Sequence, residues 1–237
     1  MLSRLFRRNS PPIPDRIVSL GALCEVAYQV RRLTRSERAY PFDWWVTPLG
    51  SVLKVLEAGA PAVFQASKLM KVPDYGGTPA LYSHLSGTIH LHEFPAGEDF
   101  LAMEEAEMAR RLIPKYESLQ ARLLADCAQG TTLFVRQCLP AHDPKAEALE
   151  AAIDGLHARL QTFAANPLLL LLDYAPVKQR PWLLTATVPR LDDCADTGSP
   201  RGWDRTFRSL GISCRRGEAF RFDDLRETMV APDDPTP

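Results

Sequence analysis

The chain has 237 residues and a mass of 26.4 kDa, with 46% hydrophobic and 24% charged residues, a composition typical of one globular domain. Its 28 basic and 29 acidic residues give a formal net charge of −1, which argues against general binding to nucleic acid or to an anionic membrane surface. No run reaches the ~18 apolar residues of a membrane span. We therefore expect no integral membrane contact.

The five cysteines are odd in number and contain no C-x-x-C spacing, which disfavours both a disulfide framework and a zinc ribbon. A reducing, cytoplasmic setting fits this cysteine usage best. Along the chain we predict a basic, disordered arm over residues 1–14, a single α/β domain over 15–230 and a disordered tail over 231–237. Within the domain we expect an irregular site-loop region at 61–97.

The N-terminal half begins with a predicted strand, a tight turn and a helix. Residues 15–20 form a short apolar run that ends at Gly21, and apolar residues at helical spacing follow up to Leu33. An aromatic loop at 39–48 and a short helix at 51–58 come next. The frequent prolines and glycines of 61–97 predict irregular structure with one short strand near 88–92. Residues 98–126 have a helical composition, and Pro114 is expected to start a second helix there.

The C-terminal half alternates predicted strands and helices. Residues 131–136 are rich in β-forming types, 145–165 carry apolar residues at alternate steps of four and three, 167–174 are almost continuously apolar, and 183–188 form a further strand. Strands that are apolar on both faces are typical of a parallel sheet covered by helices. We therefore predict a three-layer α/β domain with a largely parallel sheet flanked by helices, and we expect Trp203 and Phe207 in its core.

Cys24 is the residue that points most directly to chemistry. It lies three positions after Gly21, at the predicted first turn of a helix that follows a strand, where unpaired N–H groups and the helix dipole favour the thiolate. Such strand-to-helix turns also line the ligand crevice of open α/β sheets. Glu25 beside it opposes the thiolate, and a small buried cysteine without chemistry is the alternative.

A thiol nucleophile needs a base, and His84, His90 and His92 lie together in the irregular region. His90 and His92 alternate in a strand-like pattern and so should point to one face, with Glu93 nearby as a carboxylate that could orient an imidazole. The H-x-H spacing also fits two metal ligands. Since no third ligand is marked, we expect neither a metal nor a cofactor.

The aromatic loop contains Asp43 between Phe42 and Trp44. A carboxylate in such surroundings must be hydrogen-bonded or paired with a charge. Asp43 is therefore either structural, for example through Arg38, or a third member of the catalytic site. Trp44 and Trp45 fit a packed loop and equally a platform that stacks a sugar or a base.

Four short motifs together resemble a known family. In order and spacing they are similar to the bacterial DUF1796 family of papain-like cysteine peptidases, over about residues 17–136: Ser19-Leu20-Gly21 with Cys24, Tyr40-Pro41-Phe42-Asp43-Trp44, His92-Glu93-Phe94, and Leu133-Phe134-Val135-Arg136. The resemblance implies that Cys24 is the nucleophile and His92 the general base, and that a papain-like α+β fold is the alternative architecture. Glu93 stands where the family motif has an aspartate.

Our leading hypothesis is a cysteine-dependent hydrolase, of peptidase or acyl-transferase type, that acts on a small-molecule, peptide or glycan-linked substrate. Cys24 attacks a carbonyl, His92 moves the proton, and backbone amides near Gly21 hold the oxyanion. The expected catalytic set also includes Glu93 and Asp43. The expected substrate-binding residues are Ser19, Gly21, Trp44, Trp45, His90 and Arg136.

Two hypotheses from other classes stay open. The first is a Rossmann-like module that handles a nucleotide sugar or glycan, with the two tryptophans as a stacking platform and Arg136 as a phosphate contact. The second is a non-catalytic binding domain, in which Cys24 is no more reactive than Cys127 or Cys138.

Overall fold

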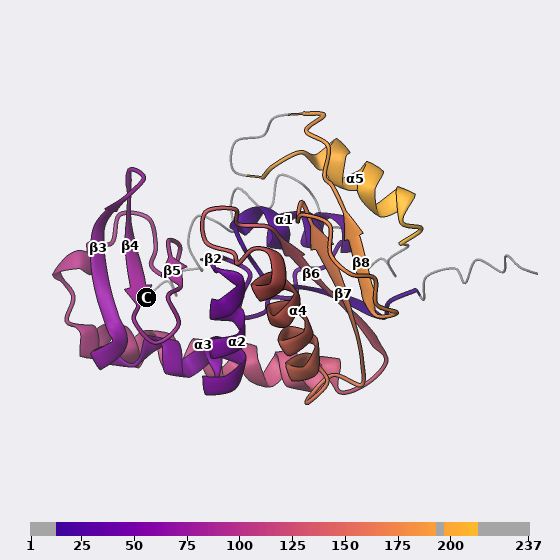
Figure 1. Ribbon diagram of the computed structural model, residues 1–237. Helices are drawn as coiled ribbons and strands as arrows, with labels where there is room; N and C mark the ends of the chain where they lie inside the picture. Colours follow the sequence, from indigo (N-terminus) through magenta and orange to yellow (C-terminus); the bar gives the residue numbers. More distant parts are fainter. Residues whose placement is uncertain (1–12, 193–196, 213–237) are drawn as a thin grey trace, which may run out of the picture.

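The computed structural model describes residues 13–192 and 197–212. Its centre is a parallel sheet in the order β1-β6-β7-β8, made of β1 (Arg16–Ser19), β6 (Thr131–Gln137), β7 (Asn166–Leu172) and β8 (Leu183–Ala186) (Figure 1). β1 is an edge strand and pairs with β6 in parallel. The predicted tail, most of the predicted arm, Cys194 and Cys214 lie outside the described residues.

Helices cover both faces of this sheet (Figure 1). On one face α1 (Cys24–Thr34) and α5 (Pro200–Ser209) share a buried cluster with Ile17 and Leu133. On the other face α2 (Leu49–Ala58), α3 (Glu105–Cys127) and α4 (Ala146–Leu160) pack with Val18 and Phe134. Successive strand residues point to opposite faces, so burial of both faces explains the continuous apolar runs. The predicted three-layer α/β architecture is confirmed.

The region predicted to be irregular contains a second sheet. It is antiparallel, in the order β2-β5-β4-β3, and consists of β2 (Trp45–Val46), β5 (Ile89–His90), β4 (Thr78–Ser83) and β3 (Leu69–Tyr75). Gly76 and Gly77 join β3 to β4 with φ values of +63° and +92°, which suit the tight turn of a hairpin. The short strand predicted near 88–92 is confirmed as β5, but the irregular structure predicted before it is wrong, because these glycines close a hairpin instead of interrupting structure.

Short 3-10 helices connect this sheet to its neighbours: η1 (Ala60–Phe64), η2 (Ala66–Lys68) and η3 (Phe100–Ala102). The helix that follows, α3, is continuous through Pro114, so the predicted start of a second helix there is wrong. The exposed proline costs one backbone hydrogen bond. Leu112 and Tyr116 continue one buried stripe past it, and this packing outweighs the local cost.

The C-terminal helix α5 closes the face that carries α1. Ser199 caps it by accepting a hydrogen bond from the Gly202 N–H. Trp203 and Phe207 are 0% and 3% exposed, so their expected place in the core is confirmed. Among the helices of the described residues, none has the length and apolarity needed to cross a bilayer.

Candidate functional site

The turn between β1 and α1 carries the predicted nucleophile. Gly21 and Ala22 have φ values of +75° and +90°, and the second is unusual for a residue with a side chain. The Ser19 hydroxyl accepts from the Gly21 N–H at 3.1 Å, and the Thr47 N–H donates to the Ala22 carbonyl at 3.1 Å. These contacts hold a strained turn, and Cys24 follows it as the half-buried first residue of α1.

The N-terminus of α1 carries the partial positive charge of the helix dipole. Leu23 is the N-cap residue, and its side chain offers no acceptor to the first N–H groups of the helix. Those groups and the helix dipole therefore favour a negative charge at this end. The turn also lies at the carboxyl edge of the parallel sheet, where open α/β sheets bind ligands.

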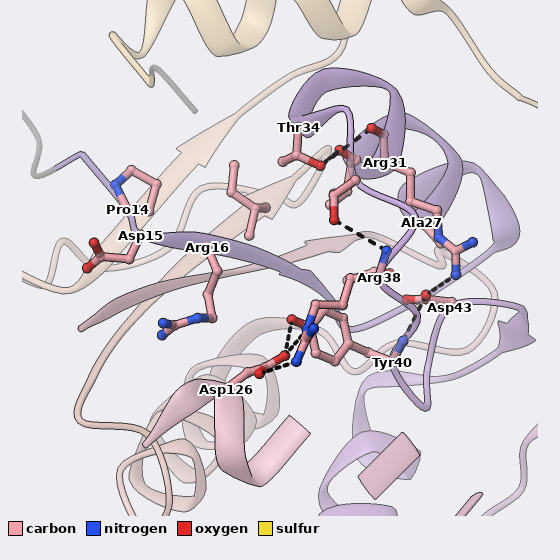
Figure 2. Close-up of a pocket in the computed structure, with 14 residues that line it drawn as sticks. Pro14, Asp15, Arg16, Ala27, Arg31, Thr34, Arg38, Tyr40, Asp43 and Asp126 are labelled. Atoms are coloured by element: carbon pink, nitrogen blue, oxygen red, sulfur yellow. Dashed lines mark hydrogen bonds and ion pairs between the residues drawn. The ribbon is translucent and has the colours of Figure 1, made fainter. Parts of the chain in front are cut away.

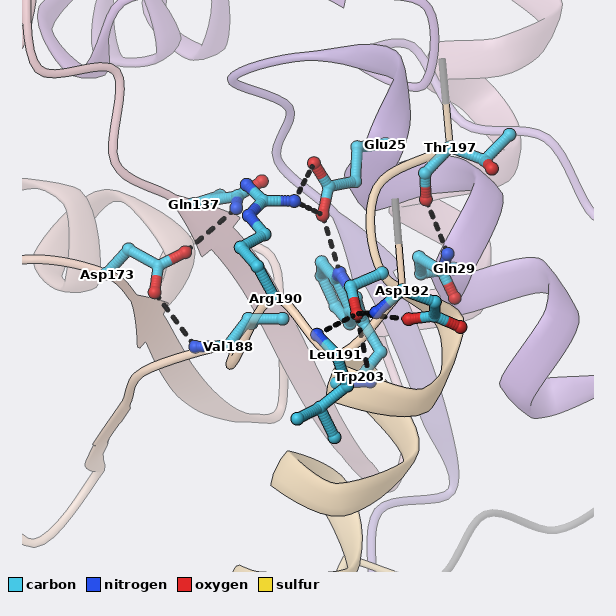
Figure 3. A network of polar contacts seen from close by, with 12 residues as sticks. Glu25, Gln29, Gln137, Asp173, Val188, Arg190, Leu191, Asp192, Thr197 and Trp203 are labelled. Carbon is cyan, nitrogen blue, oxygen red and sulfur yellow. Dashed lines mark hydrogen bonds and ion pairs between the residues drawn. The ribbon is translucent and has the colours of Figure 1, made fainter. Parts of the chain in front are cut away.

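The carboxylate of Glu25 lies in the interface with α5, beside Arg190 and Trp203 (Figure 3). It accepts a hydrogen bond from the Trp203 indole at 2.8 Å and pairs with Arg190 at 3.1 Å. Gly198 passes so closely that a Cβ there would lie 2.0 Å from the Glu25 carboxyl carbon. Because Arg190 compensates its charge, Glu25 opposes a Cys24 thiolate less than its place in the sequence suggests.

Arg136 connects the turn between β1 and α1 to the neighbouring loops. Its side chain is fully buried and forms an ion pair with Asp143 at 2.9 Å. It donates to the Leu20 and Thr47 carbonyls at 3.2 and 2.8 Å and to the Tyr174 hydroxyl at 2.8 Å. Every guanidinium nitrogen therefore has at least one internal partner, and because the side chain is fully buried it is not accessible for the phosphate contact considered from the sequence. Arg136 positions the loops at the carboxyl edge.

His90 lies in β5 and is 1% exposed. Its Nε2 is 2.8 Å from the Thr88 hydroxyl, its Nδ1 is 3.6 Å from a Glu93 carboxylate oxygen, and its ring packs against Trp45 and Phe64. Burial lowers the pKa of His90, although the neighbouring Glu93 carboxylate works in the opposite direction. Burial thus favours the neutral form of the imidazole, and the ring is part of the core.

Glu93 belongs to the same buried network. Its carboxylate accepts hydrogen bonds from the Trp45 indole at 3.1 Å, the Tyr116 hydroxyl at 2.5 Å and the Lys115 ammonium at 2.9 Å. Burial alone would raise its pKa, but the neighbouring His90 imidazole and the charge of Lys115 outweigh burial and hold the pKa of Glu93 at about 2. Glu93 therefore faces His90.

His92 has different surroundings. The strand ends at His90, so His92 lies in the following bend with an exposed side chain. The expectation that the two histidines share one face is wrong, because the alternation of a strand does not continue through the bend. His84 is also exposed, beside the ring of Tyr82.

Asp43 and the two tryptophans are part of the packing around α1 and the antiparallel sheet. Asp43 pairs with Arg31 at 2.7 Å and accepts from the Tyr40 N–H at 3.0 Å. Arg31 is seven residues beyond Cys24, about 10 Å along the helix, and its guanidinium lies over the Trp44 ring. Trp45 is 0% exposed, so neither of its faces is open to a ligand.

Sequence reasoning did not find three side chains that shape this edge of the sheet, namely Thr47, Asp143 and Tyr174. Asp143 had a signal, since it follows a strand in the loop where the carboxyl ends of parallel strands meet. Thr47 and Tyr174 carried none, because only the tertiary fold brings them to Arg136. In the described part of the chain, no group of three or more His, Cys, Asp or Glu side chains could hold a metal ion.

Comparison with known proteins gives one match. Residues 15–148, more than half of the chain, match the family model described as putative papain-like cysteine peptidase (DUF1796). The match includes the turn, α1, the antiparallel sheet, β6 and Asp143, and it ends before β7. No curated protein and no solved structure matches the chain. The chain therefore belongs to the DUF1796 family.

Proposed function

We propose that the protein is a cysteine-dependent hydrolase in which Cys24 is the nucleophile. The observation that carries this proposal is the place of Cys24 as the first residue of α1, directly after the strained turn at Gly21 and Ala22. Sharp strand-to-helix turns of this kind present a nucleophile at the carboxyl edge of a sheet. The N–H groups at the start of α1, to which the N-cap side chain offers no acceptor, favour both the thiolate and an oxyanion that forms beside it.

In the proposed reaction the Cys24 Sγ attacks the carbonyl carbon of an amide or ester and forms a tetrahedral oxyanion. Collapse of that intermediate breaks the bond to the leaving group, which takes a proton from the base, and leaves a thioester on Cys24. Water then adds to the thioester, gives a proton to the base and releases the acid together with the thiolate. Backbone N–H groups at the start of α1 stabilise both oxyanions.

His92 is the proposed base. Of the two neighbouring histidines, His90 is enclosed by Trp45 and Phe64, whereas His92 has an exposed side chain. The bend that carries His92 follows β5, which pairs with β2. The antiparallel register pairs Trp45 with His90, so His92 continues toward the end of β2 that follows Phe42, and a Cβ on Gly21 would lie 3.3 Å from the Phe42 carbonyl oxygen. This contact between the turn and the segment before β2 supports His92 as the base.

Glu93 and Asp43 support this site at a distance in our proposal. Glu93 fixes His90 and Trp45 at the base of the bend, and Asp43 fixes Arg31 on α1. The nucleotide-sugar alternative loses its main contacts, because Trp45 and Arg136 are both fully buried.

The test is the pH dependence of iodoacetamide alkylation at each cysteine of the folded protein, read by mass spectrometry. Cys127 and Cys138 are internal controls, because burial raises the pKa of Cys127 to about 11 and also raises that of Cys138. We expect Cys24 to react well below pH 8.5, the ordinary value for a thiol, and His92→Ala to slow it at neutral pH.

His142→Ala is the matched control, since His142 is another exposed histidine and should leave the Cys24 rate unchanged. Hydrolysis of fluorogenic peptide amides and p-nitrophenyl esters, lost in Cys24→Ser, would complete the assignment. If Cys24 reacts no faster than Cys138 at every pH, the proposed nucleophile is excluded.

A further inference from the structure

The outer edge of β1 presents main-chain groups that the sheet does not use. The Leu20 N–H donates to the Val135 carbonyl at 2.8 Å. In a parallel ladder this orientation recurs at every second residue, so Val18 also faces β6, whereas Ile17 and Ser19 direct their N–H and C=O groups to the open side. Within the described chain, no hydrogen bond outside the ladder involves a main-chain atom of Ile17 or Ser19.

A groove of about 360 Å³ runs along this edge (Figure 2). β1 forms one side of it, and α1, the loop that contains Arg38 and Tyr40, and the end of α3 at Asp126 form the others. Ile17 and Ser19 line the groove and are only 6% and 1% exposed. Their outward groups therefore lie inside the groove, where an unpaired main-chain donor or acceptor is costly.

The side chains of the groove add hydrogen-bond donors to this edge. Arg31 is nine-tenths buried, and its Nη2 pairs with Asp43 while its Nε has no partner. Arg16 bonds to the Gln129 carbonyl and the Thr132 hydroxyl and to no carboxylate among the described residues. The acidic side chains Asp43 and Asp126 are already paired with arginines. With Asp15 included, the lining carries three arginines and three aspartates, so the groove is neutral, but the Arg31 Nε remains a buried donor without an acceptor.

We propose that this groove binds an extended peptide segment with a carboxylate side chain, which adds to β1 as a further strand. Ile17 and Ser19 offer donor and acceptor pairs about 7 Å apart, the two-residue repeat of an extended chain. Strand addition to an open sheet edge uses these main-chain groups for affinity and the neighbouring side chains for selectivity. A glutamate of the peptide supplies the acceptor that the Arg31 Nε lacks.

This inference concerns binding and does not require the chemistry of Cys24. β1 continues directly into the turn before Cys24, so a bound segment lies along the strand that leads to the proposed nucleophile. Binding is measured in the Cys24→Ser variant, because a failure of the proposed hydrolysis then leaves the result unaffected.

The probe is a fluorescein-labelled hexapeptide, Thr-Val-Glu-Val-Thr-Val, followed by fluorescence anisotropy. Two versions carry N-methyl groups on alternate amides, one version for each edge of the extended peptide. Since a strand added to β1 uses one edge, we expect one methylated version to bind like the parent and the other to bind at least 10-fold more weakly. Replacement of the glutamate by glutamine should weaken binding about 3- to 10-fold because the charge-assisted bond is lost.

Ser36→Trp fills the groove from its rim and should abolish binding, while Ser36→Ala is the matched control that should not. Circular dichroism shows whether both variants fold. Amide hydrogen exchange by NMR supplies a local readout: the peptide should slow exchange at Ile17 and Ser19 and leave Val18 unchanged, since Val18 already bonds to β6. No binding at 1 mM peptide, equal binding to Ser36→Trp, or protection confined to other residues would overturn the proposal.

Discussion

Arg136 is the side chain whose removal should disturb this protein most clearly. In Arg136→Met the Leu20 and Thr47 carbonyls lose their donors inside the protein, and the Asp143 carboxylate loses its counter-charge. Breaking a buried ion pair from one side costs about 3–5 kcal/mol, because the remaining charge stays buried. Loss of a partner by each buried carbonyl adds a cost of about 1–3 kcal/mol.

Other hydrogen bonds to Asp143 reduce this loss of stability. The Leu49 and Leu139 amides at 2.7 and 2.9 Å and the Tyr174 hydroxyl at 2.6 Å still donate to Asp143 in the variant. We therefore expect the total decrease in the free energy of unfolding to stay below the sum of these separate costs, at about 3–5 kcal/mol. Arg136→Lys keeps the charge but loses the planar guanidinium. Its free energy of unfolding should therefore lie between those of Arg136→Met and the wild type.

Urea unfolding followed by circular dichroism measures the effect, and in a domain of this size the melting temperature should fall by roughly 6–20 °C. Arg38→Met is the matched control. Arg38 also pairs with a carboxylate, that of Asp126, but its side chain is 54% exposed, so its removal should cost less than about 1 kcal/mol. A loss below 1 kcal/mol for Arg136→Met, or one equal to that of Arg38→Met, would refute this account of the buried cluster.

Three further outcomes follow from the structure. Gly21→Ala should lower the free energy of unfolding by about 1–3 kcal/mol and slow the alkylation of Cys24. The reason is that the φ of +75° at this position is strained for alanine, and the new Cβ would lie 3.2 Å from the Thr47 hydroxyl oxygen. An unchanged free energy of unfolding would contradict this prediction. The pKa of Glu93 is about 2, below its ordinary 4.5, so the ionised carboxylate stabilises the fold above about pH 4.5 and this stabilisation is lost as the pH falls toward 2. Glu93→Gln should flatten the pH dependence of urea unfolding in that window, and parallel curves for variant and wild type would argue against it. Pro114→Ala should raise the melting temperature, with a gain of about 1–2 kcal/mol, because proline is the poorest residue for a helix interior; a drop in thermal unfolding temperature would show that the helix needs the proline.

Parts of the site could be predicted from the sequence because their signals are local. Gly21 marks the end of a strand, and the apolar spacing that follows it fixes the start of the helix at Cys24. The fate of the two histidines could not be predicted in this way. A short strand pattern does not reveal where the strand ends, and its end at His90 buries that side chain and exposes His92.

The ion pairs could not be predicted from the sequence either. The sequence offered Arg38 as a partner for Asp43, but the structure pairs Asp43 with Arg31 and Arg38 with Asp126. The partners of Arg136 could not be predicted either. Nothing in the sequence of its strand indicates that its donors bond to the Leu20 and Thr47 carbonyls and to Asp143. Long side chains choose partners by proximity in space, and proximity between distant segments is a property of the tertiary fold.

By itself, the sequence determined the parallel α/β core. Apolar runs at 131–136 and 167–174 and the helical spacing between them depend on the periods of strands and helices, and those periods are local properties of the chain. Only the tertiary structure decided that 69–90 forms an antiparallel sheet, that α3 passes through Pro114, and that β1 lies at an edge beside a groove. Each of these depends on which surfaces meet, because burial against a distant partner outweighs the local preference of a glycine or a proline.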